Sequence, residues 1–471
     1  MSRFVEKLIE NSRADIYPMH MPGHKRVALP FEENDAISHI RAIDITEIEG
    51  FDNLHAPEGI IGELQERIAG IFGVPKSLML VNGSTCGVLA AISACVRPGG
   101  TILMARNSHI SAYNAVNVGG LKSVYLYPEI CEEGISGGID PEAVRQALDS
   151  DDTIQAVFVT SPTYEGVISD IEKISNIAHD HGVPLIVDEA HGAHLSLCPS
   201  LEEKYGMAGA MQRGADIAVQ SLHKTLPSFT QTAVLHYSPR LIDEDRLRRC
   251  VSTYQTTSPS YILMAGVDRC MDVLEKKGEA LFAEYERNLE AFYEKAASLE
   301  KIKLLRWEDL KGKHCISGFD IGKLVMFAGS GKGLYETLLR EHGIQTEMYG
   351  INYCLAMTSF MDNGGAFDRL LKAVEECDKI YADGRDKAGE LPPFAGSIRP
   401  RSVMTISRAL NGELSGPGAS DGSYDPTFIC RNFVFACPPG VPVMVPGELF
   451  TEEILDTLEA MSAGGIRMLY R

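Results

Sequence analysis

Short apolar runs alternate with helical patterns through the middle of the chain. The runs are rich in Val, Ile, Leu and Ala and contain few polar positions, which is typical of strands buried on both faces. The pattern therefore predicts an α/β domain with a mostly parallel seven-stranded sheet and helices on both sides. The strands are expected at Ser77–Val81, Thr101–Ala105, Ser123–Leu126, Ala156–Thr160, Leu185–Val187, Ala215–Gln220 and Ala233–His236.

Capping residues mark several of the intervening helices. The helical pattern of Ile61–Phe72 stops at Gly73, and that of Ile171–His181 stops at Gly182. Glycine favours the left-handed conformation that commonly ends a helix. Asp140, which precedes a proline, indicates a helix start. Ligands of such sheets bind beyond the carboxyl ends of the strands, so the residues after each strand are the candidates for chemistry.

The pattern changes along the chain and predicts four parts. They are an N-terminal arm (1–55), a large domain (56–275), a small α/β domain (276–390) and a C-terminal domain (391–471). Within the small domain the pattern predicts helices at Glu275–Leu299, Gly333–His342 and Phe367–Ala382, and strands at Lys303–Leu305 and Lys323–Phe327. The Pro-rich segment Leu391–Pro393 is typical of a linker. The Gly- and Ser-rich segment Asn411–Asp425 is expected to be a mobile loop, and a lid over the site is the alternative.

Composition and charge narrow the class of protein. The 471 residues are 45% hydrophobic and 23% charged, as in folded globular proteins. The net charge of −20 disfavours nucleic acid and anionic membranes as partners, and it would attract cationic substrates, although solubility alone also explains it. The eleven cysteines are scattered without a C-x-x-C pair, which favours reduced thiols in a cytoplasm. The N-terminus lacks a secretion signal, and no apolar run reaches the roughly 18 residues of a membrane helix.

The turn after the first strand is a candidate phosphate site. Asn82–Gly87 opens an apolar helix and contains Ser84 and Thr85. Free backbone N–H groups, the positive end of the helix dipole and two hydroxyls would bind an anion there. The alternative is that Ser84 or Thr85 only caps the helix.

Polar residues also follow the next two strands. His109 follows the strand at Thr101–Ala105 and would stack on a ring, unless it is an ordinary surface histidine. Tyr164 and Glu165 lie in a turn after Ala156–Thr160 and would reach the same edge, or they belong to an ordinary turn.

Asp188 ends another buried strand and needs a partner, because an isolated buried carboxylate is unfavourable. A protonated pyridine nitrogen would suit it; backbone N–H groups are the alternative. His191 and His194 follow closely, but no third ligand at a zinc-like spacing accompanies them, so no metal is expected.

Lys224 follows the strand that ends at Gln220. A lysine there can form a Schiff base with a carbonyl cofactor, and Ser221 and His223 beside it can bind a phosphate. The alternative is a surface lysine. Together the strand ends offer partners for an aldehyde, a ring nitrogen and a phosphate, which are the three groups of pyridoxal 5′-phosphate.

At this point the chain resembles the short form of the bacterial ornithine/lysine/arginine decarboxylases, which are fold-type I enzymes of aminotransferase-like architecture. The resemblance runs from about residue 18 to 450 and is specific for the family. The motifs that carry it are Met21–Lys25, Asp52–Pro57, Asn82–Thr85, Asp188–Gly192, Ser221–Lys224, Thr256–Tyr261, Pro438–Pro442 and Pro446–Glu448.

The resemblance implies roles for the matching residues. Lys224 would carry the cofactor, Asp188 would bind its ring nitrogen, and His109 would stack on its ring, with Ala190 and His191 beside it. The phosphate would be bound by Ser84, Thr85, Ser221 and His223, and by Thr256 or Thr257 of a neighbouring subunit. The minimal active unit would then be a homodimer with shared sites, and a higher oligomer stays open.

The implied reaction is decarboxylation of a basic L-amino acid, which gives CO2 and a polyamine or its precursor. Arginine is slightly favoured over lysine and ornithine, and Lys224 or His223 would protonate the product carbon. A basic substrate needs an acidic partner for its distal group. Candidates for substrate contact are Glu347, Glu165, His55 and Tyr164.

Two alternatives stay open. The fold also suits an aminotransferase or a decarboxylase of a non-basic substrate, because fold does not fix the reaction. A non-catalytic regulator is disfavoured, since it would not need both Lys224 and Asp188. The chain departs from the family pattern at Asn432 and Gly350, where carboxylates are expected, so the resemblance leaves the substrate open.

Overall fold

The computed structural model describes most of the chain. The described residues are 3–14, 19, 21–22, 25, 36–381, 398–413, 425–437, 440–463 and 466–470. Gly23 and His24, the expected linker at 391–393, most of the expected loop at 411–425, and Pro438–Pro439 lie outside this part of the chain.

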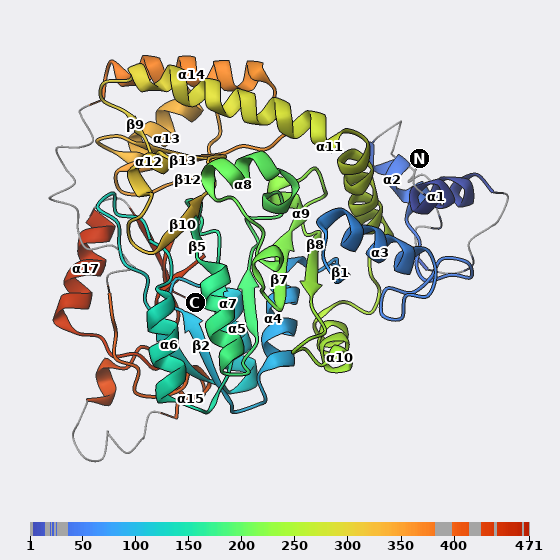
Figure 1. Ribbon diagram of the computed structural model, residues 1–471, viewed down its shortest axis with the longest axis horizontal. Coiled ribbons are helices and arrows are strands. Elements are labelled where there is room, and N and C mark those ends of the chain that lie inside the picture. The colour runs from blue at the N-terminus through green and yellow to red at the C-terminus, as the bar shows by residue number, and fades with distance from the viewer. Residues whose placement is uncertain are drawn as a thin grey trace.

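A seven-stranded sheet forms the centre of the molecule (Figure 1). In spatial order its strands are β1 (Lys76–Leu80), β8 (Ala233–Tyr237), β7 (Ile217–Ser221), β6 (Leu185–Asp188), β4 (Ile154–Thr160), β2 (Thr101–Ala105) and β3 (Lys122–Leu126). Only β8 runs antiparallel to its neighbours, and the other pairs are parallel. The seven expected strands are therefore confirmed, and so is the mostly parallel α/β fold.

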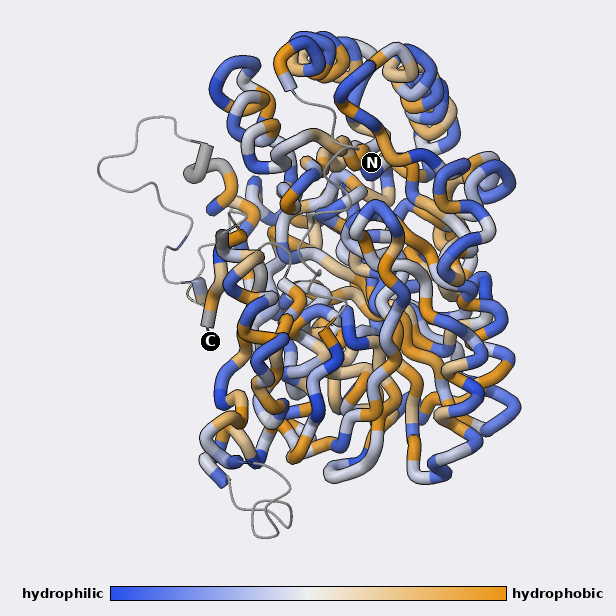
Figure 2. Tube along the Cα trace, turned by 90° about the vertical axis from the view of Figure 1, so that its left-hand side faces the viewer, coloured by the Kyte–Doolittle hydropathy of each residue, from blue (hydrophilic) through white to orange (hydrophobic). Residues whose placement is uncertain are grey.

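Helices cover both faces of this sheet because its strands are apolar on both sides. Val157 and Phe158 are neighbours in β4, yet they belong to different hydrophobic clusters. One cluster includes α4 (Gly83–Cys95), α5 (Ile110–Gly119) and α10 (Glu244–Tyr254); the other includes α6 (Pro141–Ser150) and α7 (Ile171–Asp180). Figure 2 shows hydrophobic segments running through the interior and hydrophilic ones along the outer turns.

The expected caps are present. Gly73 ends α3 (Ile60–Phe72) with φ 62°, and the Asp140 carboxylate accepts from the backbone N–H of Glu142 at the start of α6.

The longest helix, α11 (Tyr261–Lys295), begins earlier than the sequence predicted. Its second half is strongly charged, whereas its first half packs against α1 (Arg3–Arg13) and α3, with the ring of Tyr261 stacked on that of Phe4. The helix then continues beside α14 (Gly364–Asp378) along one side of the molecule (Figure 1). The expected boundary at residue 275 lies inside this helix, and the division into four domains stays a prediction.

Two smaller sheets complete the architecture. An antiparallel sheet contains, in order, β12 (Met348–Tyr349), β13 (Tyr353–Met357), β11 (Lys323–Phe327) and β9 (Lys303–Leu304), next to α13 (Gly331–Arg340). The C-terminal part contains β15 (Pro442–Met444), β14 (Val434–Cys437) and β16 (Arg467–Tyr470), with α15 (Ile406–Leu410) and α17 (Glu452–Ala463). The other described α-helices and strands are α2 (Ala36–Ile43), α8 (Pro199–Tyr205), α9 (Leu222–Thr225), α12 (Trp307–Leu310), and the pair β5 (Val167–Ser169) and β10 (Ile316–Phe319).

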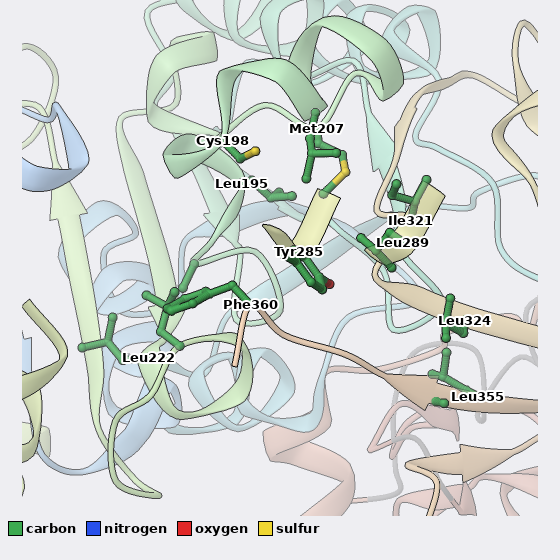
Figure 3. Packing of buried hydrophobic residues seen from close by; sticks show 14 of the residues in the cluster. Leu195, Cys198, Met207, Leu222, Tyr285, Leu289, Ile321, Leu324, Leu355 and Phe360 are labelled. Carbon is green, nitrogen blue, oxygen red and sulfur yellow. The ribbon is translucent and has the colours of Figure 1, made fainter. Parts of the chain in front are cut away.

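One hydrophobic cluster joins α11 and the small antiparallel sheet to part of the large domain, whereas C-terminal residues such as Val434 and Met444 pack in a separate cluster. Figure 3 shows Tyr285 and Leu289 of α11 in the same packed region as Leu324 of β11 and Leu355 of β13. Leu222, two residues before Lys224, belongs to this cluster as well, so the core holds the short helix that carries the lysine. Within the described residues, no helix has the length and apolar character needed to cross a bilayer.

Candidate active site

A cavity of about 350 Å³ lies at the carboxyl ends of the central strands. Side chains that the sequence singled out from five different segments meet there. They are Ser84, His109, Tyr164, Glu165, Asp188, Ala190, His191 and Lys224. Residues of the small and C-terminal parts also line the cavity, among them Tyr353, Gly440 and Met461.

The start of α4 forms one wall. Ser221 donates from its hydroxyl to the Ser84 hydroxyl at 2.9 Å. Helix α4 can approach the sheet closely because residue 87 is glycine: a Cβ there would lie 2.7 Å from side-chain atoms of Leu80 and Val219. The pair of hydroxyls thus lies at a helix N-terminus, which suits a phosphate. Thr85, by contrast, is exposed and is not part of the cavity wall.

His109 caps α5 and faces the cavity. Its Nδ1 accepts from the backbone N–H of Ser111 at 3.2 Å, which fixes the ring. Gly440 packs against the ring: a Cβ there would lie 3.0 Å from its Cδ2 and Nε2 atoms. Desolvation lowers the pKa of His109, and Lys224 adds to this effect while Asp188 opposes it. Burial therefore favours the uncharged ring.

Asp188 lies at the end of β6 and is 4% exposed. Its Oδ1 accepts from the backbone N–H of Ala190 at 3.2 Å. Nearby, Thr160 Oγ1 and Asn107 Oδ1 are buried in the cavity wall and have no hydrogen-bond partner among the described residues. These groups and the Ser84–Ser221 pair match the polar edges of a small aromatic phosphate, so the residues present fit pyridoxal phosphate.

Lys224 extends from α9 into the cavity. Its Nζ lies 3.1 Å from His191 Nε2. Desolvation lowers the pKa of Lys224, although Asp188 and Glu347 act in the opposite direction. His223 is oriented differently: its Nδ1 lies 2.9 Å from the carbonyl oxygen of Thr232, and its side chain is not part of the cavity wall.

Two tyrosines hold the acidic residues at the other end of the cavity. Tyr353 donates to Glu165 at 2.8 Å, and the Tyr164 hydroxyl donates to Glu347. Gly350 lines the cavity beside them, and a Cβ there would lie 2.3 Å from the Tyr353 ring. The carboxylate expected at 350 is absent, and Tyr353, which would contact a side chain there, donates to Glu165 instead. Asn432 is exposed and lies away from the cavity wall.

His55 and Thr256 meet each other outside the cavity. His55 Nε2 lies 2.8 Å from the Thr256 carbonyl oxygen, and the Thr256 N–H donates to Asn82 Oδ1 at 3.3 Å. This group therefore lies beside the N-terminus of α4. Thr256 and Thr257 are exposed, and contact with a neighbouring subunit stays a prediction.

Sequence reasoning missed two buried cations at the site. Arg106 directly follows β2 and pairs with Glu448. Its position after a strand was the sequence signal, but the prediction selected His109 from the same turn instead. Lys323 begins β11 and is 1% exposed. Its only signal was a charged residue beside an apolar run, and its contact with His191 joins segments 132 residues apart.

No group of three or more potential metal ligands was found among the described residues. His194 instead pairs through Nε2 with Asp320 Oδ1 at 3.3 Å.

The comparisons with known proteins agree with this architecture. Residues 2–320 match the family model described as Orn/Lys/Arg decarboxylase, major domain. An arginine decarboxylase of Bacillus subtilis is 32% identical over 447 residues, which are 92% of this chain and 88% of that protein.

Two solved structures share the fold. A lysine decarboxylase of Francisella novicida has a TM-score of 0.82 at 20% identity, and the match covers 99% of this chain and 78% of that one. A structure of SPT with PLP has a TM-score of 0.52 at 14% identity, covering 68% of this chain and 76% of that one. The expected aminotransferase-like fold is thereby confirmed, and the chain belongs to the Orn/Lys/Arg decarboxylase family, a family of amino-acid decarboxylases, which are lyases.

Proposed function

We propose that this chain is a pyridoxal 5′-phosphate-dependent decarboxylase of a basic L-amino acid, with arginine favoured over lysine and ornithine. The observation that carries the proposal is the meeting of Lys224, Asp188, His109 and Ser84 in one cavity, with Ser221 bonded to Ser84 behind its wall. The names of its relatives, arginine and lysine decarboxylases, support the substrate class, and a structural neighbour that contains PLP supports the cofactor.

Each of these residues would hold one part of the cofactor. Ser84, Ser221 and the start of α4 would bind the phosphate, Asp188 the ring nitrogen, and His109 the face of the ring, with Ala190 beside it. Bound there, pyridoxal phosphate would supply a conjugated ring that accepts the electron pair left when a carboxylate departs.

The chain's own groups would control protons around that chemistry. The side chain of Asp188 would lie against the ring nitrogen, and a carboxylate beside a ring nitrogen favours the protonated form of that nitrogen. Desolvation lowers the pKa of Lys224 and so favours its uncharged amine, which is the form that acts as a nucleophile. Of the two expected proton donors, Lys224 faces the cavity, whereas His223 is bound to the Thr232 carbonyl. We therefore assign protonation of the product carbon to Lys224.

Substrate selection would rest on Glu165 and Glu347. Glu165 lines the cavity. Tyr164 lines it too, and its hydroxyl donates to Glu347. Both carboxylates would then lie toward the end of the cavity into which the distal cation of the substrate extends. The −20 net charge of the chain would favour the approach of a cationic substrate.

The proposal extends to assembly and location. A homodimer with shared sites would bring Thr256 or Thr257 of one subunit to the phosphate in the other, and both residues are exposed for such a contact. A cytoplasmic location is supported by ten described cysteines that are all free.

A single experiment separates the alternatives. The full-length protein is reconstituted with pyridoxal phosphate, its visible absorption is recorded, and CO2 release is measured with arginine, lysine and ornithine. We expect a visible band, CO2 release, and loss of both in Lys224→Ala but not in the exposed-lysine control Lys277→Ala. Amino transfer without CO2 would favour the aminotransferase, and an unchanged band in Lys224→Ala would refute the cofactor assignment.

A further inference from the structure

The segment that leads into β8 lies between two walls of the cavity. Strand β8 is placed between β1 and β7 and is antiparallel to both, so it begins at the edge where those two strands end (Figure 1). Its first residue, Ala233, pairs with Leu80 on one side and with Ser221 on the other. The residues just before Ala233 are therefore flanked by the turn at residues 81–83, called here the α4 turn, and by the short helix α9 that carries Lys224.

Gln231 holds the α4 turn with two groups. Its side-chain Nε2 donates to the carbonyl oxygen of Val81 at 2.7 Å, and its own carbonyl oxygen accepts from the backbone N–H of Gly83 at 2.9 Å. The next residue, Thr232, holds α9, because its carbonyl oxygen accepts from the N–H of Leu222 at 3.2 Å. Two consecutive residues thus join the start of α4 to the helix that carries the lysine.

The backbone of Gln231 indicates that a side chain is needed at this position. Its φ is 83°, in the left-handed region that glycine adopts readily and a long side chain adopts rarely. The residue is exposed and is not part of the cavity wall, so neither burial nor contact with a ligand explains a non-glycine residue there. The contact with Val81 does explain it, because a glycine would supply the carbonyl group to Gly83 but not the amide.

A second segment holds the α4 turn as well. The N–H of Val81 donates to Oε1 of the buried Gln255 at 2.8 Å, and the N–H of Thr256 donates to Asn82 Oδ1 at 3.3 Å. Both polar backbone groups of Val81 therefore bind a glutamine side chain. The Gln255 contact comes from the segment before α11, whereas the Gln231 contact comes from the segment that also holds α9.

We propose that Gln231 is a positioning residue for the phosphate end of the site, which fixes the α4 turn, and with it Ser84, relative to Lys224. This deepens the proposed function, on which it rests. A cofactor that is held by Lys224 at its aldehyde end and by the start of α4 at its phosphate end needs a constant separation between the two. Gln231 acts on this separation through Val81 and Gly83.

The test compares the binding of pyridoxal phosphate with that of pyridoxal, which has no phosphate, to the full-length chain freed of cofactor. Gln231→Met keeps the length of the side chain but cannot donate to Val81. We expect the dissociation constant for pyridoxal phosphate to rise about fivefold, as for the loss of one hydrogen bond, and that for pyridoxal to stay within about twofold of wild type. A similar rise for both ligands would show a merely structural role, and either that result or no rise for pyridoxal phosphate would overturn the proposal.

The matched control is Gln212→Met. The side chain of Gln212 also donates to a backbone carbonyl at 2.7 Å, that of Phe72, and the residue is exposed and outside the cavity wall. This variant loses the same kind of hydrogen bond away from the site, so both dissociation constants should stay at the wild-type values. A fivefold rise for pyridoxal phosphate in this control as well would contradict a specific role of Gln231.

A second variant separates the side chain of Gln231 from its backbone. Gln231→Gly removes the unfavourable φ and keeps the carbonyl group that accepts from Gly83, so its unfolding midpoint should be close to that of wild type. It should still bind pyridoxal phosphate about fivefold more weakly, because the donor to Val81 is absent. Wild-type affinity in Gln231→Gly would show that the backbone carbonyl suffices and would refute the role of the side chain.

A measurement that needs no cofactor separates this proposal from the proposed function. Hydrogen exchange of the peptide that covers residues 80–90 should be about fivefold faster in Gln231→Met than in wild type, and unchanged in Gln212→Met. Unchanged exchange in Gln231→Met would refute positioning of the α4 turn, whatever the chain binds. Failure of the wild type to bind pyridoxal phosphate would instead refute the cofactor assignment.

Discussion

The buried ion pair of Arg106 and Glu448 attaches the C-terminal part of the chain to the large domain. Arg106 is 6% exposed and Glu448 is fully buried. The guanidinium donates to both carboxylate oxygens at 3.2 and 3.0 Å, and the N–H of Val445 donates to Oε2 at 2.8 Å. Burial raises the pKa of Glu448, but the Arg106 cation and the N–H of Val445 oppose this shift and favour the ionised carboxylate.

Glu448→Gln keeps the shape but leaves the Arg106 cation without its counter-charge. Breaking a buried pair in this way costs about 3–5 kcal/mol. If this cost lowers the free energy of local opening of residues 440–450, the open state becomes more populated. A change of about 3 kcal/mol then corresponds to roughly 100-fold faster hydrogen exchange of the protected amides in this segment. Because Gly440 of the same segment packs on His109, we also expect weaker cofactor retention.

The assay is hydrogen exchange followed by mass spectrometry of peptides that cover residues 440–450, in wild type and variant. The exposed carboxylate of Glu459, changed to Gln, is the matched control and should alter exchange little. Less than about threefold acceleration in Glu448→Gln would refute the reasoning, because it would show that the pair does not stabilise this attachment.

Three further predictions follow from the site and the sheet. Gly350→Ala should lower the unfolding free energy by about 1–3 kcal/mol, since its Cβ would overlap the Tyr353 ring, and an unchanged thermal midpoint would contradict the packing. Tyr353→Phe removes the donor to Glu165, so KM for the basic substrate should rise about tenfold with kcat nearly constant; an effect on kcat alone would contradict this role. Burial lowers the pKa of His236 to about 3, whereas the same histidine in the unfolded state keeps the usual pKa of about 6.5. As pH falls below about 6.5, the unfolded state therefore gains a proton that the folded state does not. The folded state loses about 2 kcal/mol of stability by pH 5 for this reason. Urea unfolding of His236→Gln should show that much less loss than wild type between pH 7 and 5, and an equal loss would be contrary to this account.

The sequence was most informative where a site is built from strand ends. Ser84, His109, Asp188 and Lys224 each follow or end a central strand, and parallel strands bring their carboxyl ends to one edge. The strands themselves could be located because they are short and apolar on both faces. The meeting of these four side chains therefore followed from local pattern and general topology.

Contacts between distant segments could not be predicted in the same way. The first half of α11 packs on α1 and α3, and the side chain of Ser260 caps its start, a local signal that the sequence prediction did not use. Lys323 reaches His191 from another sheet, and Glu448 reaches Arg106 across 342 residues. Such pairs depend on the packing of whole domains, for which the separate segments carry no local signal.

The most direct test of the central claim is to locate the cofactor on the chain. The reconstituted enzyme, shown to release CO2 from a basic amino acid, is reduced with borohydride, digested, and analysed by mass spectrometry. We expect a phosphopyridoxyl group on the peptide that contains Lys224, and none on Lys323. Modification of Lys323 instead, or no modified peptide in an active preparation, would contradict it.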